Sequence, residues 1–150
     1  MAQTSDSFPI FFGEFRHTLD QKNRITIPAR WRVEESNEYF ITHNVKRSCL
    51  TAYPTDVFQR VSEDSRALAA TPAEHKLFKS LFYSQAQICP IDKQGRMLLP
   101  EEFCTRAGLS SELVLAGISD RFEIWNPVAW QARKEADQAA FENLAERMGL

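Results

Sequence analysis

The sequence predicts an α+β fold built as a tandem repeat, in which two similar units of short strands are each followed by helices. Three observations indicate it: a ten-residue segment occurs twice, a second block recurs behind each copy, and a helical pattern follows each block. The first copy reads LDQKNRITIP from Leu19 to Pro28. The second reads IDKQGRMLLP from Ile91 to Pro100. A constant internal period of this kind is the sequence signature of a duplicated structural unit.

The second block strengthens the repeat. TAYP, from Thr51 to Pro54, takes the place that IWNP takes from Ile124 to Pro127, at nearly the same separation as the first pair of segments. A stretch of strand-forming residues precedes each block, and a helical pattern with an aromatic residue near its start follows it. One short resemblance arises easily by chance. Two in the same order, with nearly constant spacing, indicate a duplicated unit of about 60 residues.

Within each unit, the Asp-x-x-x-Arg segment predicts a tight turn, so we expect each unit to open with a β-hairpin. The residue before the arginine is Asn23 in the first copy and Gly95 in the second, and both residue types accept a positive φ. Asp20 and Asp92 are expected to accept hydrogen bonds from the backbone N–H groups that follow them. The predicted structural turn residues are therefore Asp20, Asn23, Asp92 and Gly95.

Helix signals flank these strands. Pro28 and Pro100 end the second strand of each unit and suit the first turn of a helix. The segment TPAE at 71–74 is a capping box that begins a helix between the two units, and Asn126 with its following proline caps the last helix. The apolar face of that last helix either packs on its own chain, which we favour, or docks on a neighbouring subunit; its residues are Ala140, Phe141, Leu144 and Met148.

The predicted organisation has five parts. The first seven residues are small or polar, without the basic start and long apolar stretch of a signal peptide, and no run of about 18 apolar residues predicts a membrane span. We therefore expect no membrane association. The parts are a disordered leader (1–11), a first repeat (12–70), a connecting helix (71–83), a second repeat (84–131) and a C-terminal helix (132–150).

Composition argues against several function classes. The three cysteines and three histidines lack metal-ligand spacing, and an odd number of cysteines favours a reducing cytoplasm over a disulfide framework. No GxSxG, phosphate-binding loop, HExxH or glycine-rich dinucleotide motif is present. We predict no catalytic residue, no metal and no cofactor, and we expect that the protein is not an enzyme.

The case for nucleic acid is local, because the net charge is −2. The segment from Glu14 to Arg32 contains five basic residues and two acidic ones. The guanidinium of each turn suits phosphate or guanine. The alternative is an Asp–Arg salt bridge that only stabilises a turn, and both interpretations can hold together. The predicted DNA-binding residues are Arg24 and Arg96, for base edges or the adjacent backbone, and Lys22, Lys93, Arg16 and Arg30, for phosphates.

Several segments of the sequence resemble those of a known protein family. The segment GEFRHTLD at 13–20, followed by QKNRITIPARWR, resembles the first signature of MraZ proteins, and IDKQGRMLLP resembles the second. The WNP segment at 125–127 also fits. The resemblance extends roughly from Phe12 to Trp130. The family's first turn usually has glycine before the arginine, where this chain has Asn23, so the preferred operator sequence is open.

The resemblance implies an AbrB-like swapped-hairpin fold, with two halves interleaved into a double-split β-barrel with flanking helices. It also implies a ring-shaped homo-oligomer in the cytoplasm, associated with the nucleoid. Such a protein binds short direct repeats in double-stranded promoter DNA of the division and cell-wall gene cluster, usually as a repressor, and Arg24 and Arg96 match the family's DNA-contacting arginines. Two other interpretations stay open: an oligomer that binds only proteins, and an antitoxin-like protein.

Overall fold

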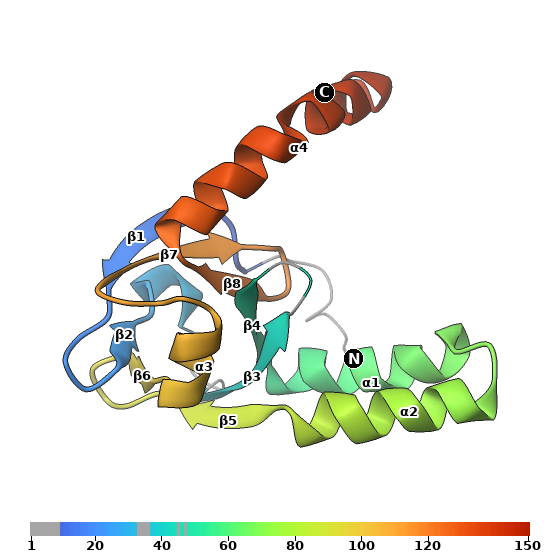
Figure 1. Ribbon diagram of the computed structural model, residues 1–150, viewed down its shortest axis with the longest axis horizontal. Coiled ribbons are helices and arrows are strands. Elements are labelled where there is room, and N and C mark those ends of the chain that lie inside the picture. Colours follow the sequence, from blue (N-terminus) through green and yellow to red (C-terminus); the bar gives the residue numbers. More distant parts are fainter. Residues whose placement is uncertain (1–9, 33–36, 45, 47) are drawn as a thin grey trace.

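The computed structural model describes residues 10–32, 37–44, 46 and 48–150. It is an α+β fold with antiparallel strands, as the sequence predicts (Figure 1). Six strands form one sheet in the order β1-β7-β8-β4-β3-β5, and β2 pairs with β6 in a separate two-stranded sheet. The strands are β1 (Glu14–Thr18), β2 (Arg24–Thr26), β3 (Glu38–Asn44), β4 (Cys49–Pro54), β5 (Gln87–Pro90), β6 (Arg96–Leu98), β7 (Glu112–Gly117) and β8 (Phe122–Trp125).

The two units share both sheets. Strand β1 pairs with β7, β4 with β8, β5 with β3, and β2 with β6, so hydrogen bonds join the first unit to the second at each of these strand pairs. The six-stranded order reads the same from either end when each strand is replaced by its counterpart in the other unit. The predicted local hairpin is therefore wrong at the first turn, whose flanking strands pair with β7 and β6. At the second turn, a single antiparallel bridge between Ile91 and Met97 joins the two sides. A two-stranded hairpin alone is marginally stable, whereas pairing across the units closes one core.

The centre of that core is aromatic. Rings from both units meet there, with Phe11 and Trp31 centroids 5.5 Å apart and Tyr39 and Phe122 centroids 5.3 Å apart. Residues 1–9 of the predicted leader lie outside the described residues. Phe11, however, is 1% exposed and pairs with Ser119. The predicted leader therefore extends too far, because an apolar ring at this position fills the space between the two units.

The helices begin where their caps predict. In α2 (Pro72–Ser84), the Thr71 hydroxyl accepts from the Glu74 backbone N–H at 3.1 Å. In α4 (Pro127–Arg147), the Asn126 side chain accepts from two backbone N–H groups of the first turn. The remaining helices are α1 (Thr55–Leu68), α3 (Glu101–Arg106) and the short 3-10 helix η2 (Ala29–Trp31).

The C-terminal helix α4 projects away from the sheet (Figure 1). Of its described residues, Trp130 is the buried one. Phe141 is 62% exposed and Met148 is 64% exposed. The favoured prediction that this apolar face packs on its own chain is therefore wrong, because the helix outruns the sheet beneath it. No helix in the described part of the chain combines the length and apolar character needed to cross a membrane.

Candidate nucleic-acid interface

The two Asp-x-x-x-Arg turns are closed by the same hydrogen bonds. In the first turn, the Asp20 N–H donates to the Arg24 carbonyl at 3.0 Å, and in the second the Asp92 N–H donates to the Arg96 carbonyl at 2.9 Å. The residue before each arginine has a left-handed backbone, with φ of 62° at Asn23 and 80° at Gly95. Asparagine and glycine adopt this region at low cost, which explains why either residue suits the turn.

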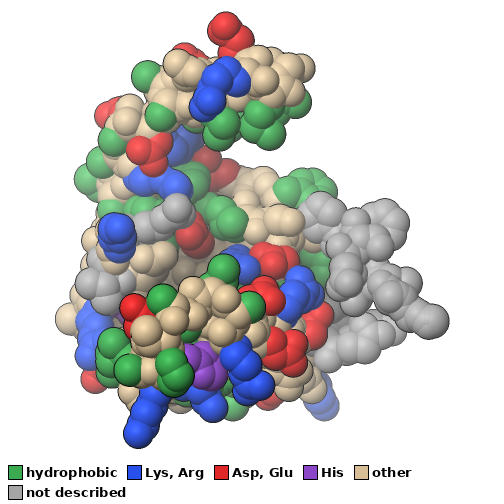
Figure 2. Space-filling model, turned by 90° about the vertical axis from the view of Figure 1, so that its right-hand side faces the viewer, with side chains coloured by type: hydrophobic (Ala, Val, Ile, Leu, Met, Phe, Trp, Pro, Cys, Tyr) green, Lys and Arg blue, Asp and Glu red, His purple; other side chains and the backbone are tan. Residues whose placement is uncertain are grey.

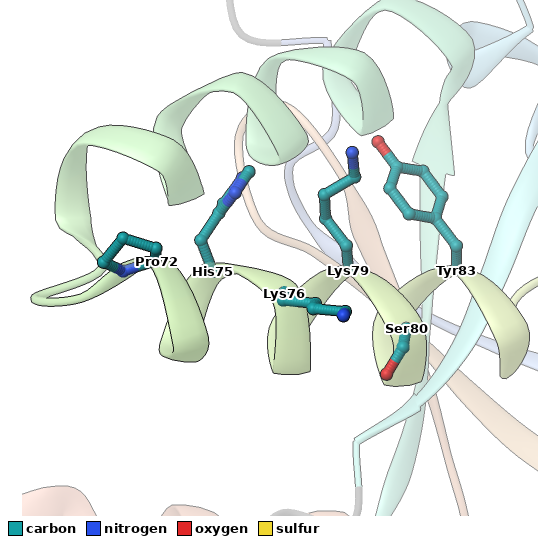
Figure 3. Close-up of a pocket in the computed structure, with 6 residues that line it drawn as sticks. All are labelled: Pro72, His75, Lys76, Lys79, Ser80 and Tyr83. Carbon is teal, nitrogen blue, oxygen red and sulfur yellow. The ribbon is translucent and has the colours of Figure 1, made fainter.

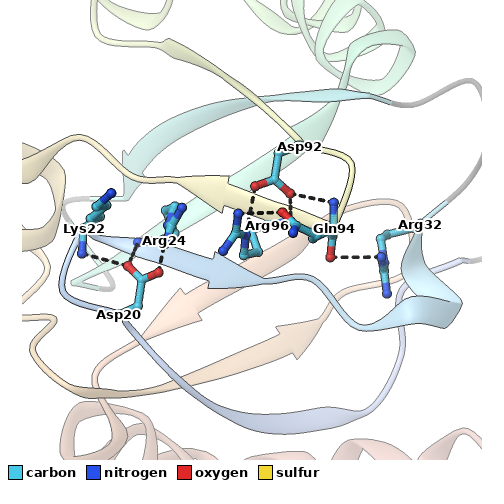
Figure 4. Close-up of polar contacts among 7 residues, drawn as sticks. All are labelled: Asp20, Lys22, Arg24, Arg32, Asp92, Gln94 and Arg96. Carbon is cyan, nitrogen blue, oxygen red and sulfur yellow. Dashed lines mark hydrogen bonds and ion pairs between the residues drawn. The ribbon is translucent and has the colours of Figure 1, made fainter.

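Each aspartate links the turn backbone to its arginine (Figure 4). One oxygen of Asp20 accepts from the backbone N–H groups of Lys22 and Arg24, and the other accepts from Arg24 Nε at 2.8 Å. Asp92 repeats the arrangement, with its bond to Arg96 Nε at 2.9 Å. The backbone N–H of the following arginine is the main cause that lowers the pKa of each aspartate.

These ion pairs orient the arginines more than they stabilise the fold. The side chains of Arg24 and Arg96 are about 30% exposed, as the pairs lie at the surface. An exposed ion pair contributes little to the free energy of unfolding, because water and salt screen its charges. Holding Nε leaves the far edge of the Arg24 guanidinium for another partner, which is the geometry that carboxylate, phosphate and guanine recognition requires. In Arg96, Nη2 also donates to the Gln94 side chain, and the remaining N–H groups face outward for a partner.

Strands β2 and β6 form a short antiparallel ribbon between the turns, called here the β2–β6 ribbon. Ile25 lies opposite Met97 at its centre, and both are fully buried. Because side chains alternate along a strand, the neighbouring residues lie on the outward face. Arg24 and Arg96 are therefore on one face, and each turn stands at an opposite end of the ribbon.

The other predicted residues lie at varying distances from this ribbon. Lys22 and Lys93 are exposed within the turns. Arg16 is on β1, opposite Val114, and lines a shallow depression with residues of α4. Arg30 is in η2, with its guanidinium 6.0 Å from the ring centroids of Phe12 and Phe15. The fold thus places both predicted lysines at the ends of the β2–β6 ribbon, while Arg16 and Arg30 belong to neighbouring elements.

One further basic residue reaches the second turn. Arg32 donates from Nη1 to the Gln94 carbonyl at 3.4 Å, and its guanidinium occupies the space where a Cβ at Gly95 would stand. Arg32 belongs to the basic segment of the sequence but is not among the predicted binding residues. No local pattern connects it with the second turn, since 62 residues separate it from Gln94.

A second basic region lies on α2. His75, Lys76 and Lys79 line an open depression of about 420 Å³, in which His75 and Lys79 point toward α1 while Lys76 points away (Figure 3). Figure 2 shows that this end of the molecule mixes basic, acidic and apolar side chains. Within the described residues, no group of three or more His, Cys, Asp or Glu could hold a metal ion. The mixed charge makes α2 a weaker nucleic-acid candidate than the ribbon.

Comparison with known proteins agrees with the duplicated architecture. A family model described as "MraZ protein, putative antitoxin-like" matches this chain twice, over residues 10–79 and 82–150. The two matches fall on the two units that the repeated segments define, and together they extend over nearly all of the described residues.

Curated relatives match over most of their own length. A protein of Desulforamulus reducens, named transcriptional regulator MraZ, is 37% identical over 139 residues, which are 93% of this chain and 97% of the relative. Proteins of the same name from Carboxydothermus hydrogenoformans and Moorella thermoacetica are 37% and 39% identical, each over 93% of this chain and 96% of the relative. With both repeats matched and most of the chain aligned, the chain belongs to the MraZ family.

Proposed function

We propose that this chain is a sequence-specific DNA-binding transcriptional regulator that enters the major groove with its β2–β6 ribbon. The observation that carries the proposal is the shared outward face of Arg24 and Arg96, with each guanidinium held at Nε by an aspartate. The major groove of B-form DNA admits a two-stranded β-ribbon. The names of the MraZ relatives support the regulatory role.

The residues divide by task. Asp20 and Asp92 position their arginines, which direct their remaining N–H donors to guanine O6 and N7 or to phosphate. Lys22, Lys93 and Arg32 surround the ribbon ends and contact phosphates, which fix the register of the protein on the duplex. Arg16 and Arg30, on β1 and η2, make outer phosphate contacts, so their removal weakens binding least.

Affinity comes from several subunits together. One ribbon offers few contacts, so in this proposal the chain works as a ring-shaped homo-oligomer on consecutive short direct repeats. Linked binding raises affinity by about a hundredfold or more without any new contact. The exposed apolar side chains of α4 support self-assembly, because such surfaces are commonly covered by a partner. The bound ring represses the division and cell-wall promoter by occlusion, in the cytoplasm and at the nucleoid.

The cross-unit pairing also supports the finer fold assignment. Each Asp-x-x-x-Arg turn sends its two strands to partners in the other unit, β1 and β2 to β7 and β6 in the first case. We infer that this is the AbrB-like swapped-hairpin arrangement, with the two sheets closing as a double-split β-barrel.

The decisive test measures binding to promoter DNA by fluorescence anisotropy. The probe is a duplex from upstream of the chain's own gene cluster, at two salt concentrations. Arg24→Ala/Arg96→Ala is expected to weaken binding by about thirtyfold or more, because each good arginine–guanine pair contributes about 1–3 kcal/mol. Circular dichroism and the oligomer mass should stay as in the wild type.

A matched control removes the same charge elsewhere. Arg66→Ala/Arg106→Ala takes two exposed arginines from the ends of α1 and α3 and should leave affinity nearly unchanged. A wild-type protein that is folded and oligomeric but binds no repeat-containing duplex would reject the proposal, and would favour an oligomer that binds only proteins. Equal losses of DNA affinity in both double variants would show that the arginines of the ribbon act only through their charge.

A further inference from the structure

The outward face of the β2–β6 ribbon carries two more side chains, Thr26 and Leu98. Thr26 lies opposite Arg96, and Leu98 lies opposite Arg24. Both residues are exposed, and Leu98 is 56% exposed even though it is a large apolar side chain opposite a charged residue. Their positions are equivalent in the two units, since each is the second residue after its turn arginine. The pair Ile25–Met97 marks the pseudo-twofold axis of the ribbon, since these residues are also each other's counterparts.

The two arginines by themselves do not select one orientation of the protein on the duplex. A ribbon that presents only Arg24 and Arg96 around a twofold axis binds the same duplex equally well in either of two orientations. Direct repeats, in contrast, require every subunit to face the same way along the DNA. Some chemical difference between the two halves of the ribbon must therefore select one orientation, and on its outward face the two strands differ only at Thr26 and Leu98.

The chemistry of these two side chains fits different base pairs. In the major groove, an apolar group packs against the C5 methyl of thymine, while a threonine can also exchange a hydrogen bond with a base edge. Leucine offers only the apolar contact. Burial of one exposed methyl or methylene group contributes about 0.8 kcal/mol, so a single contact of this kind discriminates about fourfold.

We propose that Thr26 and Leu98 are specificity-determining residues that read the base pairs between the two arginine contacts, and that their difference sets the polarity of the subunit on DNA. The ligand is B-form duplex DNA with an asymmetric core, in which the half that meets Leu98 carries a thymine methyl. This inference rests on the proposed function, since it assumes that the ribbon enters the major groove.

The test compares base preferences by selection from a duplex with a randomised core, followed by sequencing. Wild type should enrich a sequence that is not symmetric about its centre. Leu98→Thr and Thr26→Leu each make the outward face symmetric, and each should shift the base preference in one half by about fourfold or more. Thr26→Val keeps the methyl group and loses the hydroxyl, so it separates the apolar contact from the hydrogen bond.

The exchange variant Thr26→Leu/Leu98→Thr gives the sharpest outcome. It should recover the wild-type base preference, because the protein can turn end for end about the pseudo-twofold axis at Ile25 and Met97 and present the same face. Orientation is read by hydroxyl-radical cleavage from an iron chelate on Ser111→Cys, a site next to the first turn where the Ser111 carbonyl accepts from the Leu19 N–H. The native cysteines are buried, and burial raises the pKa of Cys89 to about 12, so the added thiol is labelled selectively.

Each result decides the matter. Cleavage that moves to the other end of the site in the exchange variant supports the inference. Cleavage that stays at the wild-type end overturns it, and assigns polarity to Arg32 or to the Asn23–Gly95 difference. Wild-type preferences in all the single variants also overturn it. Loss of selective binding in the wild type itself would instead reject the proposed function.

Discussion

The first and second turns of this protein share a backbone but differ in what surrounds the arginine. Corresponding hydrogen bonds of the two turns have nearly the same lengths. In the second turn, Arg96 also donates from Nη2 to the Gln94 side chain at 2.6 Å, and Arg32 lies over Gly95. Lys22 of the first turn is equivalent to Gln94 of the second turn, and Asn23 is equivalent to Gly95.

The difference makes the two arginines unequal partners. Among the described residues, the Arg24 guanidinium has Asp20 as its side-chain partner, whereas that of Arg96 is held by two side chains. A pre-organised side chain loses less conformational entropy on binding, but it also has fewer donors left. We therefore expect Arg96 to act as a fixed contact and Arg24 as an adaptable one, although the duplicated sequence makes them look identical.

The largest effect on this comparison should come from the aspartates. Asp20→Asn removes the charged partner that orients Arg24, so DNA affinity should fall several-fold in an anisotropy titration. Asp92→Asn should cost less, because Gln94 still holds Arg96. Asp92→Asn/Gln94→Ala is the matched variant, and it should lose as much DNA affinity as Asp20→Asn does. Equal losses in the two single variants would show that Gln94 does not support Arg96.

A smaller effect should follow when the turn residues are exchanged. Gly95→Asn places a side chain where the Arg32 guanidinium lies and should lower the free energy of unfolding by about 1 kcal/mol, measured by urea denaturation. Asn23→Gly should change it by only a few tenths, because Asn23 already has φ of 62° at little cost. Gly95→Asn/Arg32→Ala tests the cause: if the clash is with Arg32, this variant recovers part of the loss.

Arg32 should also be visible in the salt dependence of binding. If the ribbon neutralises about four phosphates, the slope of log K against log salt is near −3.6. Arg32→Ala removes one contact at the second turn and should reduce the magnitude of the slope by about 0.9. Arg106→Ala is the control of equal charge. An unchanged slope in Arg32→Ala would limit this residue to a structural role above Gly95.

The smallest expected effect concerns pH, and here the two turns should behave alike. Hydrogen bonds lower the folded-state pKa of Asp20 and Asp92 from the usual 3.8. Their contribution to stability is therefore complete above that value and is lost as the pH falls through the lowered pKa. Thermal unfolding of Asp20→Asn/Asp92→Asn should depend less on acid than that of the wild type. DNA binding of the wild type at neutral and mildly acidic pH should not respond to these groups.

Much of this protein was determined by the sequence alone, because the relevant interactions are local. The two turns are closed within five residues, so Asp20, Asn23, Asp92 and Gly95 carry enough information to predict them. The caps at Thr71 and Asn126 are local as well, and the structure has both. Repeated blocks at nearly constant spacing identified two related units, which the family match reproduces.

Only the tertiary structure decided which strands pair and what each surface faces. Short strands of similar composition do not specify their partners, and pairing across the units prevailed because it closes a single core over Ile25 and Met97. That pairing turns Thr26 and Leu98 outward beside the arginines and carries Arg32 to the second turn. The sheet that results is shorter than α4, so the helix extends beyond it and the apolar face of that helix is in solvent. These outcomes depend on contacts between distant residues, whose energies no local pattern of the sequence records.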